Sequence, residues 1–380
     1  MFDAIISLCD YPYEKKLFAI QIDFEKYFDN IPTSYLTKKI RDKRTVNITP
    51  HEQHVFLSLL KHRYADINSY ENGPFKRKNK GTPQGSSASL FLANLANHDL
   101  DQRLSSNAGN FARFADDVVA LCNSYEDAQK LENCFDIHCQ QSGLKINRNK
   151  SPGIAIVSEF QQEIRTVPAF DFLGYSFSSN GLSLPIKSEK KLKQKISRLI
   201  NIYLINHLKI GFSKSRANGA EDFDWDLLGL IYEIRRGLYG GLTEKDIQNY
   251  LNHKEKLPNM RGLMGFYCLL NQSKNLREID GWIVSMVRRA CVKRNQILTS
   301  IYSHSCPTPS NQELILGTWF DKDKWRDAEN GDEPELLFPS LVRGWRAARK
   351  HYFTFGLEDV QSPGYDYASD ISTLFDAFDY

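Results

Sequence analysis

The sequence predicts an α+β fold in which an antiparallel sheet backed by helices is followed by an all-α region. Short β-prone runs alternate with capped amphipathic helices over residues 1–180, and the pattern becomes almost entirely helical beyond Leu184. Apolar residues make up 41% of the 380 residues, which is enough to form two or three cores. We therefore expect a sheet-containing domain over 1–180, a helical domain over 181–300 and an accessory helical segment over 301–380.

The first part of the chain opens with a predicted strand and two predicted helices. The apolar run 17–23 is β-prone, and a short helix is expected over 33–42. Thr49 and Glu52 have the spacing of a capping box, with proline at the first helical position between them. This signal predicts a helix over 50–64.

The stretch 81–85 reads Gly-Thr-Pro-Gln-Gly, in which glycine and proline prevent a regular element. The residues of 111–122 are β-prone on both sides of Asp116 and Asp117, so we expect two strands joined by a turn that carries both carboxylates at its tip. Other elements of the same layer are expected as helices over 86–104 and 124–143 and as strands over 154–157 and 169–177.

The second half of the chain has the apolar spacing of helices. Five helices are predicted, over 188–207, 224–237, 243–252, 258–271 and 278–298. Clusters of Pro, Asp and Gly mixed with aromatic residues follow over 301–380, and we expect them to pack as an accessory helical segment.

Composition excludes several classes of protein. The seven cysteines have no paired CxxC spacing, so the sequence indicates neither a disulfide framework nor a zinc site. The N-terminus has no basic leader, and no apolar run approaches the length of a membrane span, so we expect a cytoplasmic protein with no membrane partner.

The net charge of +3 does not by itself indicate nucleic-acid binding, but the basic residues are unevenly distributed. Nine of them lie within 187–216, where Glu189 is the single acid. Such a helix face is either solvated surface or a contact surface for phosphates. The candidate phosphate contacts are Lys190, Lys191, Lys195 and Arg198.

Three carboxylates are expected to come from two strand ends. Asp23 ends the first predicted strand, and Asp116 and Asp117 occupy the tip of the predicted hairpin. Hard divalent cations prefer carboxylate oxygens, and two such ions can activate a hydroxyl and neutralise a leaving pyrophosphate. An Asp pair in a hairpin also suits an ordinary turn, so the pair alone leaves both readings open.

The chain resembles the prokaryotic reverse transcriptases of group II introns, retrons and phage defence at five motifs that occur in order across residues 15–180. These motifs are Asp23 to Asp29, Gly81 to Leu95, Phe114 to Asp117, Gly143 to Asn147 with Lys150, and Phe172 to Tyr175. The third motif has Phe114 where Tyr is commoner in the family. Segments 261–267 and 279–283 are similar to the helical thumb of the intron enzymes.

The resemblance implies a right-hand polymerase palm with partial fingers, followed by an α-helical thumb and a C-terminal helical extension. It also implies a role for each matching residue. The implied residues are Asp23, Asp116 and Asp117 as catalytic ligands of two Mg²⁺ or Mn²⁺ ions; Phe28, Gln84, Gly85 and Lys150 around the incoming nucleotide, with Phe28 excluding the ribose 2′-OH; and Leu173, Gly174 and Tyr175 as the primer grip.

The implied function is RNA-directed DNA synthesis, with dNTPs as substrates, an RNA template and a DNA product. An antiphage or retron-like enzyme with a dedicated non-coding RNA is favoured, because no HNH-like cysteine or histidine cluster follows the expected thumb. The alternative is a partner-dependent RNA-binding maturase or a scaffold subunit. Family members carry a long fingers region before the first motif, whereas 22 residues precede Asp23 here. We therefore expect a truncation, a second protein chain that supplies the fingers, or a different mode of triphosphate binding.

Overall fold

A computed structural model of the chain describes residues 1–12, 16–65, 74–77, 79–83, 85–107, 109–209, 224–252, 262–320 and 334–356. The chain forms two compact units. The first unit contains residues 1–173 and 177–180, and the second contains 174–176 and 181–380. The described residues of the predicted accessory segment belong to the second unit. The predicted three-part division at 180 and 300 stays a prediction.

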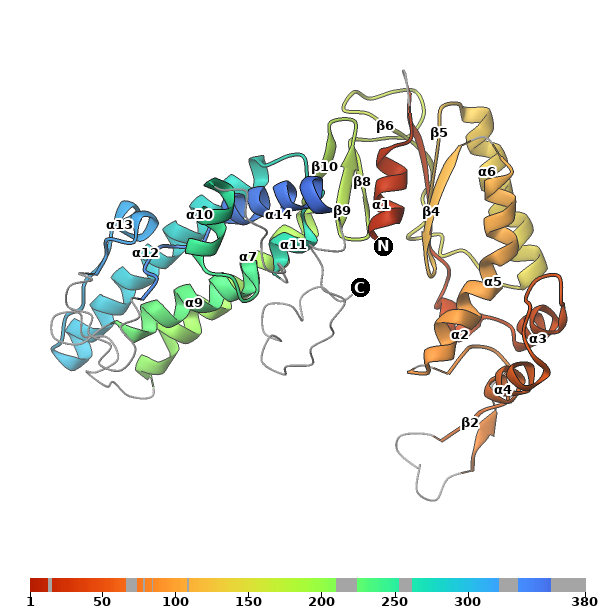
Figure 1. Cartoon of the computed structure of the whole chain (residues 1–380), viewed down its shortest axis with the longest axis horizontal. Helices are drawn as coiled ribbons and strands as arrows, with labels where there is room; N and C mark the ends of the chain where they lie inside the picture. Colours follow the sequence, from red (N-terminus) through yellow and green to blue (C-terminus); the bar gives the residue numbers. More distant parts are fainter. Residues whose placement is uncertain are drawn as a thin grey trace. The chain divides into compact units, whose positions relative to one another are not determined.

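The first unit is built on a five-stranded sheet (Figure 1). In spatial order its strands are β4 (Asn110–Phe114), β5 (Asp117–Cys122), β1 (Phe18–Ile22), β6 (Gly153–Val157) and β7 (Thr166–Val167). β1 pairs antiparallel with both β5 and β6, and β4 pairs antiparallel with β5. β7 pairs parallel with β6, so the sheet is mixed rather than purely antiparallel. β7 lies beside the last two residues of β6, with Thr166 opposite Ile156 and Val167 opposite Val157.

The helices of the first unit supply most of its core, and α1, α5 and α6 pack against the sheet. They are α1 (Phe2–Cys9), α2 (Tyr27–Asn30), α3 (Thr33–Arg41), α4 (Pro50–Leu60), α5 (Ser87–Ser105) and α6 (Tyr125–Ser142). In Figure 1, α5 and α6 lie against one face of the sheet, and α1 packs beside the edge strand β4. The buried cluster includes Ile20, Ala96, Val118 and Phe135, all completely inaccessible to solvent.

The local signals that predicted these helices act as expected at most ends. Thr49 and Glu52 form the reciprocal capping box at the start of α4. Ser86 caps α5, and Gly143, at φ +76°, ends α6 in the left-handed conformation that glycine tolerates. α4 ends at Leu60, four residues earlier than predicted, because the chain turns there and enters a strand.

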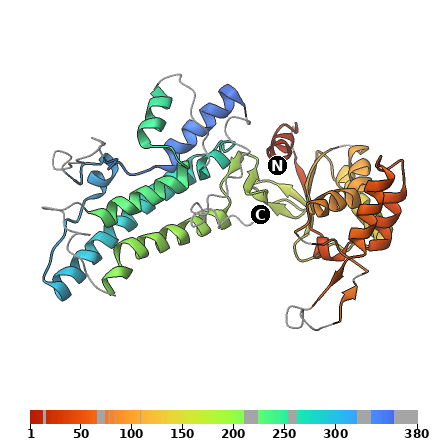
Figure 2. The same ribbon diagram turned by 60° about the horizontal axis from the view of Figure 1, so that its bottom comes forward.

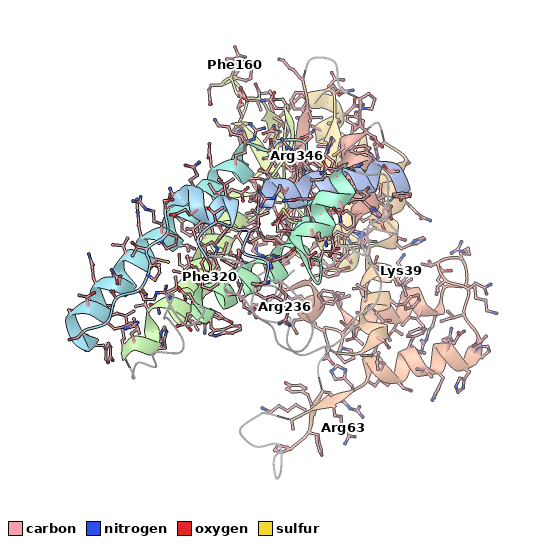
Figure 3. The ribbon with its side chains drawn as sticks, turned by 60° about the vertical axis from the view of Figure 1, so that its left-hand side comes forward. Lys39, Arg63, Phe160, Arg236, Phe320 and Arg346 are labelled. Atoms are coloured by element: carbon pink, nitrogen blue, oxygen red, sulfur yellow. The ribbon has the colours of Figure 1, made fainter. Side chains whose placement is uncertain are left out.

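The described residues also form two smaller sheets. β2 (Arg63–Tyr64) and β3 (Lys76–Arg77) form a two-stranded ribbon; Figure 3 labels Arg63 on it. β8 (Ala169–Phe172), β9 (Tyr175–Ser178) and β10 (Gly181–Ser183) form a three-stranded sheet where the chain passes from the first unit to the second. Figure 3 also labels Phe160, in the loop between β6 and β7, where its side chain is 77% exposed.

Apart from β10 and part of β9, the described secondary structure of the second unit is helical. Its elements are α7 (Ile186–Leu204), η1 (Asn206–Lys209), α9 (Trp225–Tyr239), α10 (Glu244–Asn252), α11 (Leu263–Phe266), α12 (Lys274–Tyr302), α13 (Asn311–Leu316) and α14 (Leu341–Phe355). α9 and α12 both pack along α7 (Figure 2). The helix predicted over 258–271 lies partly outside the described residues, and its described part contains only the short α11. Among the helices of the described ranges, none is long and apolar enough to cross a membrane.

Candidate active site

Asp23 lies directly after β1, at the end of the central strand of the sheet. β1 pairs with β5 in a register that joins Ile22 to Val118, so one further step along both strands places Asp23 opposite Asp117. The backbone of Asp23 is held by the segment after α6: its carbonyl accepts from the Asn147 amide at 2.8 Å, and its amide donates to Ser151 Oγ at 2.9 Å. These two hydrogen bonds therefore hold the backbone that carries the Asp23 carboxylate.

Asp116 and Asp117 lie at the hairpin between β4 and β5, as the sequence predicts. Phe114 pairs with Asp117, so the loop contains only Ala115 and Asp116. Ala115 has a φ of +56°. The two-residue turns that match the twist of the strands have a positive φ at the first loop position, where glycine, asparagine and aspartate are preferred. The turn is therefore tight, and it delivers two consecutive carboxylates to the edge where β1 ends.

The electrostatics of the three carboxylates are coupled. Burial raises the pKa of Asp117 to about 7, and the charges of Asp116 and Asp23 contribute to this rise. Burial also raises the pKa of Asp116, with the charge of Asp23 adding to the effect. Both groups are held close to like charges, so a cation would favour their ionised forms. Perturbed carboxyl groups of this kind are concentrated at functional sites.

Lys150 supplies a cation to this cluster. Its Nζ donates to Asp23 Oδ2 at 2.8 Å, and this ion pair raises the pKa of the lysine. The Lys150 side chain is 67% exposed, whereas that of Asp23 is 26% exposed. The lysine therefore reaches the site from solvent and can exchange its carboxylate partner without unfolding any element.

The donor set has the chemistry that divalent metal ions require, but it is not arranged as a closed ligand shell. Within the described part of the chain, no group of three or more His, Cys, Asp or Glu side chains is placed to hold a metal ion. The three aspartates offer hard oxygen donors, and Asp23 is engaged by Lys150. The residue types fit Mg²⁺ or Mn²⁺, and a bound ion would compete with Lys150 for the Asp23 carboxylate.

Phe28 lies on α2, five residues after Asp23, and its ring is half-buried against the main cluster and Tyr27. Its carbonyl accepts from the Thr82 amide at 2.8 Å. The close approach depends on Gly81, where an added Cβ would lie 2.9 Å from the Asp29 carbonyl oxygen. The glycine-rich loop thus fixes the backbone beneath Phe28. Part of the Phe28 ring packs against the core. Its role in excluding the ribose 2′-OH stays a prediction.

The other predicted nucleotide contacts divide into two cases. Gln84 lies outside the described residues. Gly85 is exposed, with a φ of +83°, and a Cβ added to it would have no atom within 4 Å. Its backbone conformation, rather than a lack of space, therefore favours glycine.

The predicted primer grip occupies the two-residue turn between β8 and β9. Leu173 and Gly174 have φ values of +48° and +79°, the pair of positive angles that a type I′ turn needs. Tyr175 is completely buried, and its hydroxyl donates to the Phe266 carbonyl. An added Cβ on Gly174 would lie 3.0 Å from the Phe266 ring. The ring of Tyr175 is therefore a core side chain, and the grip stays a prediction for the turn backbone.

The basic residues of α7 differ in how far they are exposed to solvent. Lys190, Lys191 and Arg198 are exposed, and Lys195 is half-buried. Lys193 instead pairs with Glu189 at 2.5 Å and lies over the Trp282 ring, 5.6 Å from its centre. The exposed residues can contact a phosphate backbone, and whether they do so stays a prediction.

Sequence reasoning missed the residues that support the site. Ser151 binds the Asp23 backbone, and Asn97 and Arg113 contact the hairpin turn. Arg113 lies within the predicted strand two residues before the turn, which marks it as a charged residue beside the carboxylates. Nothing local marks Asn97, because its partner is 18 residues away.

Comparison with known proteins agrees with the motif order. Residues 6–177 match the family model described as "Reverse transcriptase (RNA-dependent DNA polymerase)". No curated protein matched the sequence.

Solved structures similar to this chain include telomerases and a viral enzyme. Apo telomerase from Candida tropicalis, truncated from the C-terminal domain, is 16% identical to this chain. The alignment covers 46% of this chain and 36% of the telomerase chain, with a TM-score of 0.35. Candida albicans telomerase with a TWJ fragment of telomeric RNA is 16% identical, with coverages of 76% and 48% and a TM-score of 0.34. Foamy viral protease-reverse transcriptase with double-stranded DNA is 13% identical, with coverages of 71% and 35% and a TM-score of 0.30. This chain spans less than half the length of each of these structures.

Proposed function

We propose that the chain, which matches the reverse transcriptase family model at residues 6–177, is an RNA-directed DNA polymerase that uses two divalent metal ions. The observation that supports this most directly is the meeting of two strand ends: Asp23 follows β1, and the β4–β5 turn brings Asp116 and Asp117 opposite it. Burial and neighbouring like charge raise the pKa values of Asp116 and Asp117, as expected for a site that needs a bound cation.

In the proposed reaction each residue has a separate task. Asp23, Asp116 and Asp117 hold Mg²⁺ or Mn²⁺, which when bound would activate the primer hydroxyl and neutralise the leaving pyrophosphate. Lys150 leaves Asp23 and brings its positive charge to the phosphates of the incoming dNTP. The half-buried ring of Phe28 crowds the ribose 2′-OH and so favours deoxynucleotides, while Gln84 and Gly85 shape the nucleotide pocket. The turn at Leu173 and Gly174 approaches the primer.

The proposed partners are an RNA template and the DNA product, gripped by the exposed basic residues of α7. We propose an antiphage or retron-like role with a dedicated non-coding RNA. Its support is the resemblance of the five motifs to those of retron and phage-defence enzymes. Sequencing the nucleic acid that copurifies with the chain tests this role; a single recurring structured RNA supports it, and random cellular RNA contradicts it.

The catalytic assignment is tested by Asp116→Asn, which keeps the shape of the side chain and removes its charge. Primer extension on an RNA template should fall by several orders of magnitude, with little change in melting temperature. Asp136→Asn is the matched control, because Asp136 lies on the exposed side of α6 and its only described ion pair is with Arg148 at 3.5 Å. Full activity of the Asp116 variant would leave the maturase or scaffold role as the better account.

A further inference from the structure

The carbonyl oxygen of Ala115, directly before Asp116, accepts two side-chain hydrogen bonds. Arg113 Nη1 donates to it at 3.0 Å, and Asn97 Nδ2 donates to it at 3.3 Å. Ala115 is the residue at positive φ in the hairpin turn, a conformation that is unfavourable for a residue with a Cβ. Two donors from outside the turn therefore meet at the peptide whose orientation sets the direction of the Asp116 side chain.

The Arg113 guanidinium is itself fixed in place. Its Nε donates to Asp101 Oδ1 at 2.7 Å and its Nη2 to Asp101 Oδ2 at 2.5 Å, a two-point pairing that sets the plane of the group. Its Nη1 also donates to Asn94 Oδ1 at 2.9 Å. The side chain is 11% exposed. Asp101 and Asn94 both belong to α5, so this arginine ties the turn to the helix that follows the glycine-rich loop.

Asn97 is fixed from the opposite side by α6. Its Oδ1 lies 3.0 Å from His138 Nε2, and both residues are completely buried. Because the Asn97 amide donates to Ala115, its oxygen is left to accept, which assigns the ring proton of His138 to Nε2. Burial lowers the pKa of His138 to about 4, so the ring is neutral near pH 7. The histidine thus orients the amide.

We propose that Arg113 and Asn97 are positioning residues for the metal-binding turn, and that His138 acts through Asn97. Together they hold the Ala115 peptide in its left-handed conformation and so aim the Asp116 carboxylate towards Asp23. The inference rests on the proposed function, since a metal site at these aspartates is what the positioning serves. It assigns a task to buried polar groups on two helices that would otherwise only contribute to packing.

A purely structural network would lower the melting temperature and leave metal binding unchanged in the molecules that remain folded. The distinguishing measurements are therefore Mn²⁺ binding to the full chain without nucleic acid, followed by electron paramagnetic resonance, and the Mg²⁺ concentration that gives half-maximal primer extension. Both are measured below the melting temperature of each variant. Outer-sphere partners of metal ligands typically change metal affinity by roughly 10- to 100-fold.

Two variants test the turn from its two sides. Arg113→Lys keeps the charge but loses the two-point pairing with Asp101, and Asn97→Ala removes the second donor to Ala115. Each should weaken Mn²⁺ binding and raise the Mg²⁺ requirement by roughly 10-fold or more. His138→Gln retains an amide donor for Asn97 and should stay close to the wild type, whereas His138→Leu should behave like Asn97→Ala.

Arg103→Ala is the matched control. Arg103 also lies on α5 and donates to Gln141 of α6 at 2.9 Å, but none of its described contacts involves the turn. Its metal affinity should equal that of the wild type. The inference is overturned if folded Arg113→Lys or Asn97→Ala binds Mn²⁺ as tightly as the wild type.

Asp116→Asn distinguishes a failure of the proposed metal site from a failure of the positioning residues. If that variant binds Mn²⁺ as the wild type does, the proposed metal site itself fails. If it loses Mn²⁺ while folded Arg113→Lys and His138→Leu keep it, the metal site stands and only the positioning inference fails. Should Arg113→Lys or Asn97→Ala not fold, His138→Leu decides the question, because it changes neither the turn nor its two donors.

Discussion

Two sites of this chain, one in each unit, treat buried charge in opposite ways. In the first, the carboxyl groups of Asp116 and Asp117 are half-buried beside like charge, and their pKa values are raised. In the second, the side chain of Arg294 is completely buried, and it forms a two-point pair with Asp224, with Nη1 at 2.9 Å from Oδ1. The first arrangement leaves charge that a ligand can compensate, and the second leaves none.

Other charged side chains of the second unit also have partners within that unit, as Arg294 does. Arg343 Nε donates to the buried Glu244 at 3.0 Å. The Asp280 carboxylate accepts from Leu341 and Val342 amides at the start of α14, as well as from the Ser340 hydroxyl. These groups stabilise helix packing, so their number says little about binding. Incompletely compensated charge, rather than charge as such, therefore marks the candidate site.

The largest effect expected from this contrast is on the stability of the second unit. Arg294→Ala leaves the Asp224 carboxylate buried and unpaired, which should cost about 3–5 kcal/mol of unfolding free energy. Urea unfolding of the full chain measures it. The double variant Arg294→Met with Asp224→Leu removes both charges and should recover much of that loss. A single variant as stable as the wild type would show that this pair does not support the helices.

Asp117 is expected to make a smaller change in the free energy of unfolding, confined to a definite pH range. Its carboxyl has a folded pKa of about 7 against an ordinary value of 3.8, so between these values the folded protein binds a proton that the unfolded chain has released. Stability should therefore fall as pH rises through this range, by at most about 1.4 kcal/mol per pH unit from this group. Asp117→Asn should remove that slope. Parallel stability curves for the two proteins between about pH 4.5 and 6.5 would contradict it.

The local parts of this picture could be predicted from the sequence. The capping box at Thr49, the glycine stop at Gly143 and the hairpin that carries Asp116 each depend on residues within a few positions of one another. The meeting of Asp23 with that hairpin is long-range, and composition or periodicity does not fix it. Motif order predicted it, and strand register accounts for it.

Contacts between distant segments could not be predicted in this way. Tyr175 matches a primer-grip motif, yet its ring is buried beside Phe266, which lies 91 residues further along the chain. Lys150 matches a nucleotide-binding position, and its pairing with Asp23 joins residues 127 positions apart. In both cases the motif identified an important position, but only the tertiary structure shows which neighbour the side chain has.

The smallest expected effect is on nucleic-acid binding by the exposed charged residues of α7. Unlike Arg294 and Arg343, these residues are not paired in the interior of the described part of the second unit. If Lys190, Lys191 and Arg198 bind phosphates, replacing all three with Ala should weaken binding to an RNA–DNA hybrid regardless of sequence. The slope of log affinity against log salt should become shallower by about 0.9 for each phosphate that the variant no longer neutralises, because fewer counterions are released.

Lys193 provides the matched control within the same helix. Glu189 already neutralises it and the Trp282 ring covers it, so Lys193→Ala should leave the salt slope unchanged. Fluorescence anisotropy with a labelled hybrid at several salt concentrations measures both variants. An unchanged slope in the triple variant would make this face of α7 ordinary solvated surface. Equal losses in the triple variant and in Lys193→Ala would indicate damage to the helix instead, because only the exposed residues can release counterions from a bound backbone.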